Sequence, residues 1–481
     1  MIIEQIDYIP SDNKYQTLCG LLEQDWAMLL DSGVGLKQKD NSIANSYRQY
    51  DICVCQPSVR LSYENDHISI HKGSQQQSLS DKDPLEIMRE ILAEYGALSP
   101  EIPTQDQQSS ELPFNGGWIG YISYDFGLQQ TINPNSKAAD LSVPLIRMGL
   151  YQWALISDHH KETTKLYNFG LSETDWTMLK EKVFKLINDA NNNPSKQAFQ
   201  LSNPFESNLS FEDYASGFNK IRDYIYAGDC YQVNFAQRFC AEYQGSVLTA
   251  YEKLAQENNA PFSAYLNFAD QQILSLSPER FIESHQGKVT SQPIKGTLPR
   301  DPDPKIDQQL ANQLLNSKKD QAENLMIVDL LRNDLSKTAA KASVKVSELF
   351  GLYHFESVHH LISTVNSTLD DNYDNFDLLA TTLPGGSITG APKLRAMQII
   401  DELEMTKRGI YCGIIGYIDF VGNMDSNICI RTLISDKNKL YCWAGGGLVA
   451  DSQLELEYQE TLDKLGKILP ILNQTTQNKI L

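Results

Sequence analysis

Positive charge is scarce in this chain of 481 residues, in which 41 Lys and Arg stand against 61 Asp and Glu for a formal net charge of −20. Nucleic acids and anionic membrane surfaces are bound by basic patches, so neither is expected as a partner. The chain also lacks an uncharged apolar run near the ~20 residues that a membrane span requires. No basic segment followed by an apolar one opens it, so we expect no secretion signal and predict a cytoplasmic protein.

Cysteine is sparse too, with eight residues scattered along the chain and no C-x-x-C motif. This spacing predicts buried free thiols in a reducing compartment and disfavours disulfides or a metal site. No cysteine lies in a G-x-C-x-G context, which presents a nucleophile on a sharp turn. Thiol catalysis, and with it a glutaminase activity in this chain, is therefore not expected.

Strand-like and helix-like segments come in clusters, which favours an α+β fold with a large antiparallel sheet. A polar stretch at 191–208 is predicted to link an N-terminal region, 1–190, to a second region, 209–472, and 101–110 is expected to be a loop. Periodicity predicts helices at 83–95, 211–227, 318–338, 391–404 and 453–469, and strands at 26–30, 50–55, 115–121, 231–235, 264–268, 273–276, 410–420, 428–434 and 440–444.

A glycine-rich loop, Pro384–Lys393, leads into the helix predicted at 391–404. Free N–H groups and the dipole at a helix N-terminus attract anions, but the Lys-Ser/Thr pair of a P-loop is missing. An anion site and a plain tight turn explain this loop equally well.

Acidic residues suggest a second kind of site. Glu457 and Glu460 are three residues apart in a predicted helix, so their carboxylates share a face, and such oxygen ligands suit Mg²⁺. The alternative is a solvated face with an ordinary Glu460–Lys464 ion pair. Glu323 is equally ambiguous, because with Asp320 it mimics a capping box.

Three other side chains are ambiguous when each is taken alone. Lys295 ends a short extended run and would by default be exposed and inert. His360 precedes an apolar run, where a histidine is more often structural than catalytic. Arg431 lies in an apolar segment predicted to be a strand, so a carboxylate of the protein or of a ligand is expected to pair with it.

Together and in order, these segments resemble the chorismate-utilising enzymes, a family that includes component I of anthranilate synthase and of aminodeoxychorismate synthase, and the isochorismate and salicylate synthases. The resemblance implies an antiparallel β-sandwich flanked by helices, as in component I of anthranilate synthase. It covers most of 209–472, with weaker motifs at Trp26–Ser32 and Tyr50–Val54. The strong motifs are Ser277–Phe281, Pro293–Thr297, Ala322–Asp334, Val358–Ser363, Gly386–Lys393, Gly416–Tyr417, Ile430–Thr432, Gly445–Gly447 and Glu457–Thr461.

Two positions separate the branches of this family. Aminodeoxychorismate synthases carry a lysine in the Pro-Ile-x-Gly-Thr motif, as this chain does at Lys295, whereas anthranilate synthases carry Ala. Isochorismate and salicylate synthases activate water with a lysine where this chain has Gln232. The resemblance therefore implies transfer of an amino group to C4 of chorismate, giving 4-amino-4-deoxychorismate for p-aminobenzoate and folate synthesis. Anthranilate synthase activity is the alternative, as is a non-catalytic relative that binds tryptophan or docks an amidotransferase.

The resemblance also implies roles for single residues. Lys295 would form a covalent intermediate, Glu279 would be the general acid, and His360 would assist at the site. Mg²⁺ is the implied cofactor, with Glu323, Glu457 and Glu460 as its ligands. Substrate contacts are implied for Gly296, Thr297, Ser387, Thr389, Gly390, Lys393, Tyr411, Arg431, Gly445, Gly446 and Gly447.

Two partners are implied as well. Ammonia would come from a glutamine amidotransferase subunit that forms a complex with this chain. Tryptophan is bound by relatives at positions that match Ser32, Pro261, Phe262 and Ser263. A β-turn and an ordinary strand start explain these four residues at least as well.

Overall fold

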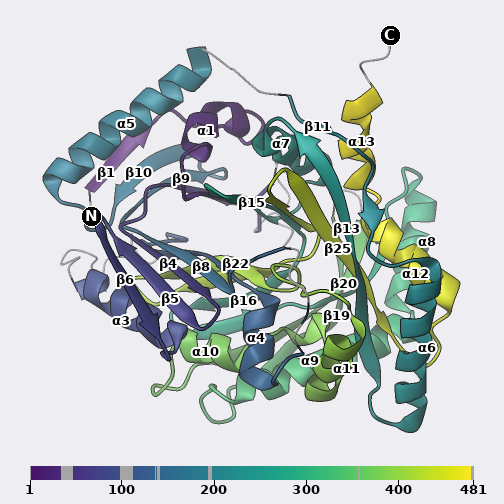
Figure 1. Ribbon diagram of the computed structural model, residues 1–481. Coiled ribbons are helices and arrows are strands. Elements are labelled where there is room, and N and C mark those ends of the chain that lie inside the picture. The colour runs from purple at the N-terminus through teal and green to yellow at the C-terminus, as the bar shows by residue number, and fades with distance from the viewer. Residues whose placement is uncertain are drawn as a thin grey trace.

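Two antiparallel β-sheets face each other and carry helices on their outer sides (Figure 1). The computed structural model describes residues 2–33, 47–97, 112–135, 137, 141–192, 198–355 and 358–477. The predicted α+β fold with a large antiparallel sandwich flanked by helices is confirmed. The loop predicted at 101–110 lies outside the described residues.

The first sheet has 13 strands among the described residues. Their order is β1 (Ile2–Ile6), β10 (Thr163–Asn168), β9 (Trp153–Asp158), β3 (Tyr50–Val54), β2 (Ala27–Asp31), β14 (Phe262–Phe268), β15 (Gln271–Ser277), β24 (Thr432–Asp436), β25 (Lys439–Leu448), β13 (Gln232–Gln244) and β11 (Gln200–Leu201), with β12 (Glu206–Ser207) and β21 (Gly390–Ala391) also paired to β13.

The second sheet has 12 strands in the same part of the chain. Their order is β18 (Ile294–Pro299), β20 (Val358–Thr368), β17 (Lys288–Ser291), β16 (Arg280–His285), β23 (Met424–Ile428), β22 (Ile414–Asp419), β7 (Gly117–Ile122), β8 (Ile146–Tyr151), β4 (Val59–Glu64), β5 (His67–Lys72) and β6 (Gln75–Ser80), with β19 (Lys345–His354) paired to β20.

The helices have the usual end signals. For example, Ser210 and Asp213 form a capping box at the start of α6, and Gly228 ends that helix in the left-handed region. No described helix is long and apolar enough to cross a membrane. The helices are α1 (Lys14–Leu22), α3 (Pro84–Ala97), α4 (Tyr124–Thr131), α5 (Glu173–Asn192), α6 (Phe211–Ala227), α7 (Val247–Asn258), α8 (Pro304–Leu315), α9 (Lys318–Ser336), α10 (Asn375–Thr382), α11 (Lys393–Leu403), α12 (Leu454–Lys464) and α13 (Leu469–Gln477), with a 3₁₀ turn at Gly386–Ile388.

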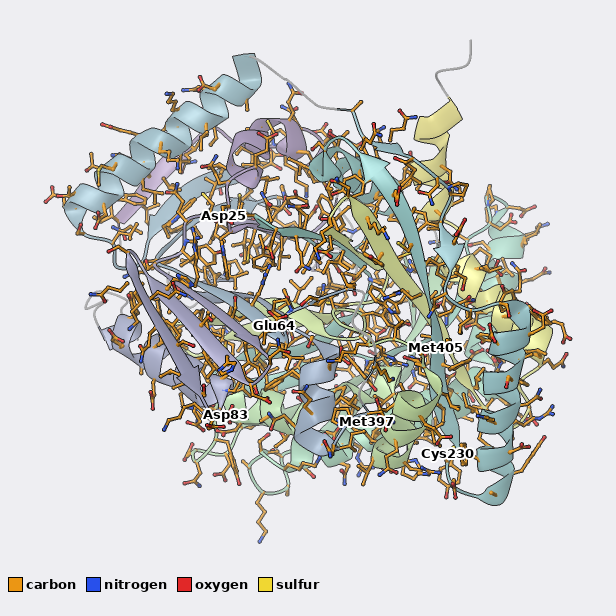
Figure 2. All side chains as sticks on the ribbon, viewed as in Figure 1. Asp25, Glu64, Asp83, Cys230, Met397 and Met405 are labelled. Carbon is orange, nitrogen blue, oxygen red and sulfur yellow. The ribbon has the colours of Figure 1, made fainter. Side chains whose placement is uncertain are left out.

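Side chains fill the space between the sheets and helices (Figure 2). The buried apolar ones form two clusters: one lies between the sheets and extends to α9 and α11, and the other lies under the outer helices of the first sheet. Successive side chains of a strand point to opposite faces of the sheet, so neighbouring residues belong to different clusters. Ile273 of β15 faces the inter-sheet core, whereas Leu274 faces the layer that also holds Leu18 of α1 and Leu254 of α7. Both faces of the first sheet are therefore covered, and its central strands β14, β15 and β24 are buried along almost their whole length.

The N-terminal and second regions share both sheets. β2 pairs with β14 in the first sheet, and β7 pairs with β22 in the second. The predicted linker, 191–208, contains β11 and β12, which pair with β13, and its residues 193–197 lie outside the described part. Strands of both regions lie next to one another in each sheet. The division into an N-terminal and a second region therefore stays a prediction.

Two predicted elements are wrong. The strand predicted at 428–434 is two strands, because the chain leaves β23 in the second sheet and enters β24 in the first. Arg431 lies at this break with φ of 52°, a left-handed conformation that cannot continue a strand. The closing helix predicted at 453–469 is divided into α12 and α13, with Gly466 in the turn between them.

Candidate active site

Two strand connections between the sheets lie side by side and place Glu279 next to the Arg431 segment. The backbone N–H of Ile428 donates to the carbonyl of Glu279 at 3.1 Å, and that of Leu276 donates to the carbonyl of Arg431 at 3.1 Å. The hydroxyl of Ser277, which is fully buried, donates to the carbonyl of Ile428 at 2.6 Å. These bonds fix both connections rigidly, so the site is built on strand ends.

Lys295 lies in an irregular part of β18. The pairing of β18 with β20 shifts register between Ile294 and Thr297, and Gly296 has φ of 81°. A Cβ on Gly296 would lie 2.9 Å from Leu314 Cδ1, so glycine is needed there for space as well. The bulge directs Lys295 Nζ to Glu323 Oε1 at 3.4 Å and to the carbonyl oxygen of Ser387 at 3.1 Å.

Glu279 is the buried carboxyl group of the site. It is 7% exposed, and the N–H of Ile294 donates to its Oε1 at 3.5 Å. Burial raises the pKa of Glu279, and the nearby ammonium of Lys295 only partly offsets this. A carboxyl group that keeps its proton more readily than usual suits a general acid.

His360 is kept neutral by its surroundings. Burial, followed by the charge of Arg431, lowers the pKa of His360 to about 4. Its Nδ1 lies 2.8 Å from the hydroxyl of Thr297. The ring thus acts as a neutral hydrogen-bonding group beside the Lys295 bulge.

Arg431 has no carboxylate partner among the described residues. Its guanidinium is largely buried, and burial lowers its pKa. An unpaired buried cation is costly, so a ligand carboxylate is the natural partner here. The partner expected from the sequence is therefore not supplied by the described protein groups.

The glycine-rich loop contributes backbone groups more than side chains. Ser387 accepts from Lys295 through its carbonyl, and its side chain lies against Glu279. The hydroxyl of Thr389 is buried and donates to the carbonyl of Gly385 at 3.1 Å. Gly390 has φ of 144°, and a Cβ there would lie 2.1 Å from a β13 carbonyl oxygen, so the loop packs tightly on that strand.

Lys393 is placed away from the site. Its Nζ donates to Asp334 Oδ2 at 2.9 Å and to the carbonyl of Thr382 at 2.9 Å. Asp334 lies three turns after Glu323 in α9, which is roughly 16 Å along the helix axis. The geometry therefore gives no support to the predicted substrate contact of Lys393.

Tyr411, for which a substrate contact was predicted, is part of the hydrophobic core. It is 3% exposed and stacks on Trp443 with ring centroids 6.2 Å apart, and burial raises its pKa well above the usual value.

The glycines of β25 make room for polar groups. A Cβ on Gly447 would lie 1.9 Å from Gln232 Nε2, and one on Gly445 would lie 2.6 Å from the carbonyl oxygen of Phe235. Gln232 uses this space to donate to Glu323 Oε1 at 2.9 Å. Sequence reasoning noted Gln232 only for the missing lysine and did not predict this contact.

Glu457 and Glu460 come together over Gly446. A Cβ there would lie 3.3 Å from Glu457 Oε2 and 3.8 Å from Glu460 Oε1. Lys464, predicted only as an ordinary ion-pair partner, donates to the carbonyl of Gly445 at 2.8 Å and pairs with Glu460 at 2.7 Å. Burial raises the pKa of Glu457, and the charge of Glu460 adds to the rise.

No three acidic, histidine or cysteine side chains of the described residues are grouped closely enough to hold a metal ion as they stand. However, Lys464 pairs with Glu460, and its charge also favours the ionised forms of Glu323 and Glu457, so all three predicted ligands feel the same cationic group. Carboxylate oxygens gathered around a positive charge match the donor chemistry that Mg²⁺ requires. The residues therefore fit a hard cation in type, with Lys295 and Lys464 supplying the compensating charge.

The four residues matched to tryptophan binding line one cavity of about 310 Å³ between the sheets. Ser32, Pro261, Phe262 and Ser263 share its wall with Arg280, Tyr47 and Asp425. Arg280 lies against the rings of Tyr47 and Phe262, at 5.2 and 5.1 Å from their centroids, and pairs with Asp425 at 2.9 Å.

The site joins a lysine, a buried acid and an arginine that has no carboxylate partner among the described residues. Sequence comparison shows the family of the chain. The chain belongs to the chorismate binding enzymes, whose sequence profile matches residues 48–470. It is 43% identical to aminodeoxychorismate synthase component 1 of Salmonella typhimurium, over 92% of each chain, and 43% identical to that of Escherichia coli, over 93% of this chain and 94% of the relative.

Anthranilate synthases are more distant relatives. Identity is 33% to anthranilate synthase component 1 of Acetivibrio thermocellus, over 86% of this chain and 84% of the relative. Among solved structures, anthranilate synthase component I from Streptococcus pneumoniae superposes with a TM-score of 0.74 at 30% identity, covering 90% of this chain and 95% of the other.

Proposed function

We propose that this enzyme converts chorismate and ammonia to 4-amino-4-deoxychorismate. The observation that carries the proposal is the place of Lys295, whose ammonium contacts Glu323 and the Ser387 carbonyl and is near the buried carboxyl group of Glu279. The 43% identity to aminodeoxychorismate synthase component 1 over nine-tenths of the chain supports this function over that of anthranilate synthase.

The charged groups suit a dicarboxylate. Arg431 offers a buried guanidinium with no partner among the described side chains, which would pair with one substrate carboxylate. His360 is neutral at pH 7, so it contributes hydrogen bonds without adding charge. The acidic protein would otherwise repel the dianion, and this local cation reverses the field at the site.

The chemistry divides one difficult displacement into two. Lys295 first loses a proton, for which the carboxylate of Glu323, at 3.4 Å, is the basic group in contact with it. Its nitrogen then attacks C2, the ring double bonds shift, and the C4–O bond breaks as Glu279 protonates the departing hydroxyl to water. Ammonia attacks C4, the double bonds shift back, and the C2–N bond breaks to release Lys295.

Mg²⁺ is proposed as the cofactor, with Glu323, Glu457 and Glu460 as ligands. Bound there, it would polarise a substrate carboxylate and neutralise charge. Lys464 would have to leave Glu460, because the ammonium and the metal compete for the same oxygens.

A glutamine amidotransferase subunit is proposed as the ammonia source. Four buried thiols do not suit nucleophilic catalysis, since burial raises the pKa of Cys55 and Cys412 to about 12 and that of Cys53 and Cys429 well above the usual value. The name component 1 of the relatives also implies a second subunit for them.

Tryptophan is proposed as the occupant of the 310 Å³ cavity. Aromatic and apolar walls suit an indole, and Ser32, Arg280 and Asp425 offer polar groups to an amino acid.

Product analysis tests the proposed function. Purified protein with chorismate, Mg²⁺ and an ammonium salt should release 4-amino-4-deoxychorismate as the main product. Anthranilate as the main product would assign the chain to the other branch, and no turnover with any amine source would favour a non-catalytic role. Lys295→Ala should abolish amination at C4, and anthranilate formed by that variant would support the covalent role.

A further inference from the structure

Two buried oxygen atoms on β13 have no hydrogen-bond partner in the described part of the chain. They are Gln232 Oε1 and Asn234 Oδ1, from residues that are 2% and 9% exposed. Side chains two residues apart in a strand point to the same face, so both oxygens belong to one face of β13. A buried polar atom left without a hydrogen bond destabilises the protein, so a ligand that donates hydrogen bonds to both oxygens is expected.

The orientation of the Gln232 amide follows from its partner. Glu323 pairs with the ammonium of Lys295 at 3.4 Å, and a carboxylate in an ion pair only accepts hydrogen bonds. The amide nitrogen must therefore face Glu323, at 2.9 Å, and the amide oxygen is turned away from it. Gly447 keeps this arrangement in place, because any Cβ there would collide with the amide.

These acceptors adjoin the reacting lysine. Glu323 Oε1, which accepts from Gln232, also lies 3.4 Å from Lys295 Nζ. Gln232 and Lys295 therefore contact the same carboxylate oxygen of Glu323. A molecule held by the two amide oxygens would lie beside the site where the covalent step occurs.

The unpaired oxygens of Gln232 and Asn234 favour a ligand with several hydrogen-bond donors. Two amide oxygens next to a carboxylate offer acceptors only. Ammonium has only donors and ammonia has three, whereas water has two donors and needs donors for its own lone pairs. We propose that Gln232 and Asn234 form an ammonia site, which binds the nitrogen nucleophile before it attacks the substrate. This inference rests on the proposed function, which makes ammonia the second substrate.

The test measures the KM for ammonium in the wild type and in Gln232→Met and Asn234→Leu variants, with Mg²⁺ and saturating chorismate. We expect each variant to raise this KM at least tenfold. Asn234→Asp keeps an acceptor oxygen and should stay within about threefold of the wild type. Asn375→Leu is the matched control, because Asn375 also has a buried unpaired oxygen but lies at the start of α10, outside the site, and should leave the KM unchanged.

A second measurement distinguishes a loss of ammonia binding from a loss of folding or of chorismate binding. Without ammonia, the Lys295 adduct trapped in the Asn234→Leu variant should match the wild type by mass spectrometry. A wild-type KM for ammonium in both Gln232→Met and Asn234→Leu would overturn the ammonia site, as would an equal rise in Asn234→Leu and Asn234→Asp. A wild type that makes no aminated product would instead refute the proposed function.

Discussion

At the scale of single residues, Gly447 shows how a missing side chain positions a catalytic carboxylate. Gln232 reaches Glu323 only because position 447 has no Cβ. Gly447→Ala should therefore displace Gln232 and lower kcat for amination at least tenfold, measured with ammonium as the nitrogen source. Gly96→Ala is the control, since its Cβ would make only an ordinary contact at 3.6 Å and should leave kcat unchanged. Equal kcat values for both variants would contradict this role of Gly447.

His360 gives a prediction about pH. Its pKa is about 4 in the folded protein and near 6.5 when unfolded, so the unfolded chain binds more protons between these values. Stability from this residue is complete above pH 6.5 and is lost as the pH falls towards 4. Between pH 7.5 and 5, the wild type should lose roughly 2 kcal/mol more unfolding free energy than His360→Gln. Urea titrations measure this, with His67→Gln, at an exposed position, as the control. Equal losses in wild type and His360→Gln would contradict it.

At the scale of elements, a buried charged cluster attaches α1 to β2 and β3. Lys14, 1% exposed, pairs with Asp31 at 2.5 Å and with Asp51 at 2.8 Å. Lys14→Met would leave two buried carboxylates without their ammonium, which should cost about 3–5 kcal/mol of unfolding free energy. Lys180→Met removes an ion pair with Glu4 that is partly exposed, and should cost at most ~1 kcal/mol. Urea titration compares the two, and similar losses would mean that the cluster does not hold α1.

The elements also show what the sequence can predict. The helix predicted at 211–227 is found as α6 because a capping box and a glycine stop are local signals. The strand predicted at 428–434 is wrong because apolar periodicity does not report the left-handed backbone at Arg431, which takes the chain from one sheet to the other. The family resemblance implied a substrate contact for Lys393, and the tertiary pairing of its ammonium with Asp334 is a contact that the sequence motif does not report.

At the scale of the whole molecule, the site lies where the chain passes between the two sheets. Glu279 connects β15 to β16, Arg431 connects β23 to β24, and Lys295 and Gln232 come from opposite sheets. Ordered motifs in the sequence predict that these residues work together, as the family resemblance implied. They do not predict Gln232 as the donor that holds Glu323, because that contact depends on a glycine more than 200 positions away in the sequence.

The central claim is that Lys295 attacks the substrate, and trapping the adduct tests it most directly. Protein incubated with chorismate and Mg²⁺ without ammonia, then quenched and digested, should carry the dehydrated substrate on the peptide that contains Lys295. Addition of ammonium before the quench should remove this label and release 4-amino-4-deoxychorismate. An active wild type with no label on that peptide, or with the label on another residue, would contradict the account.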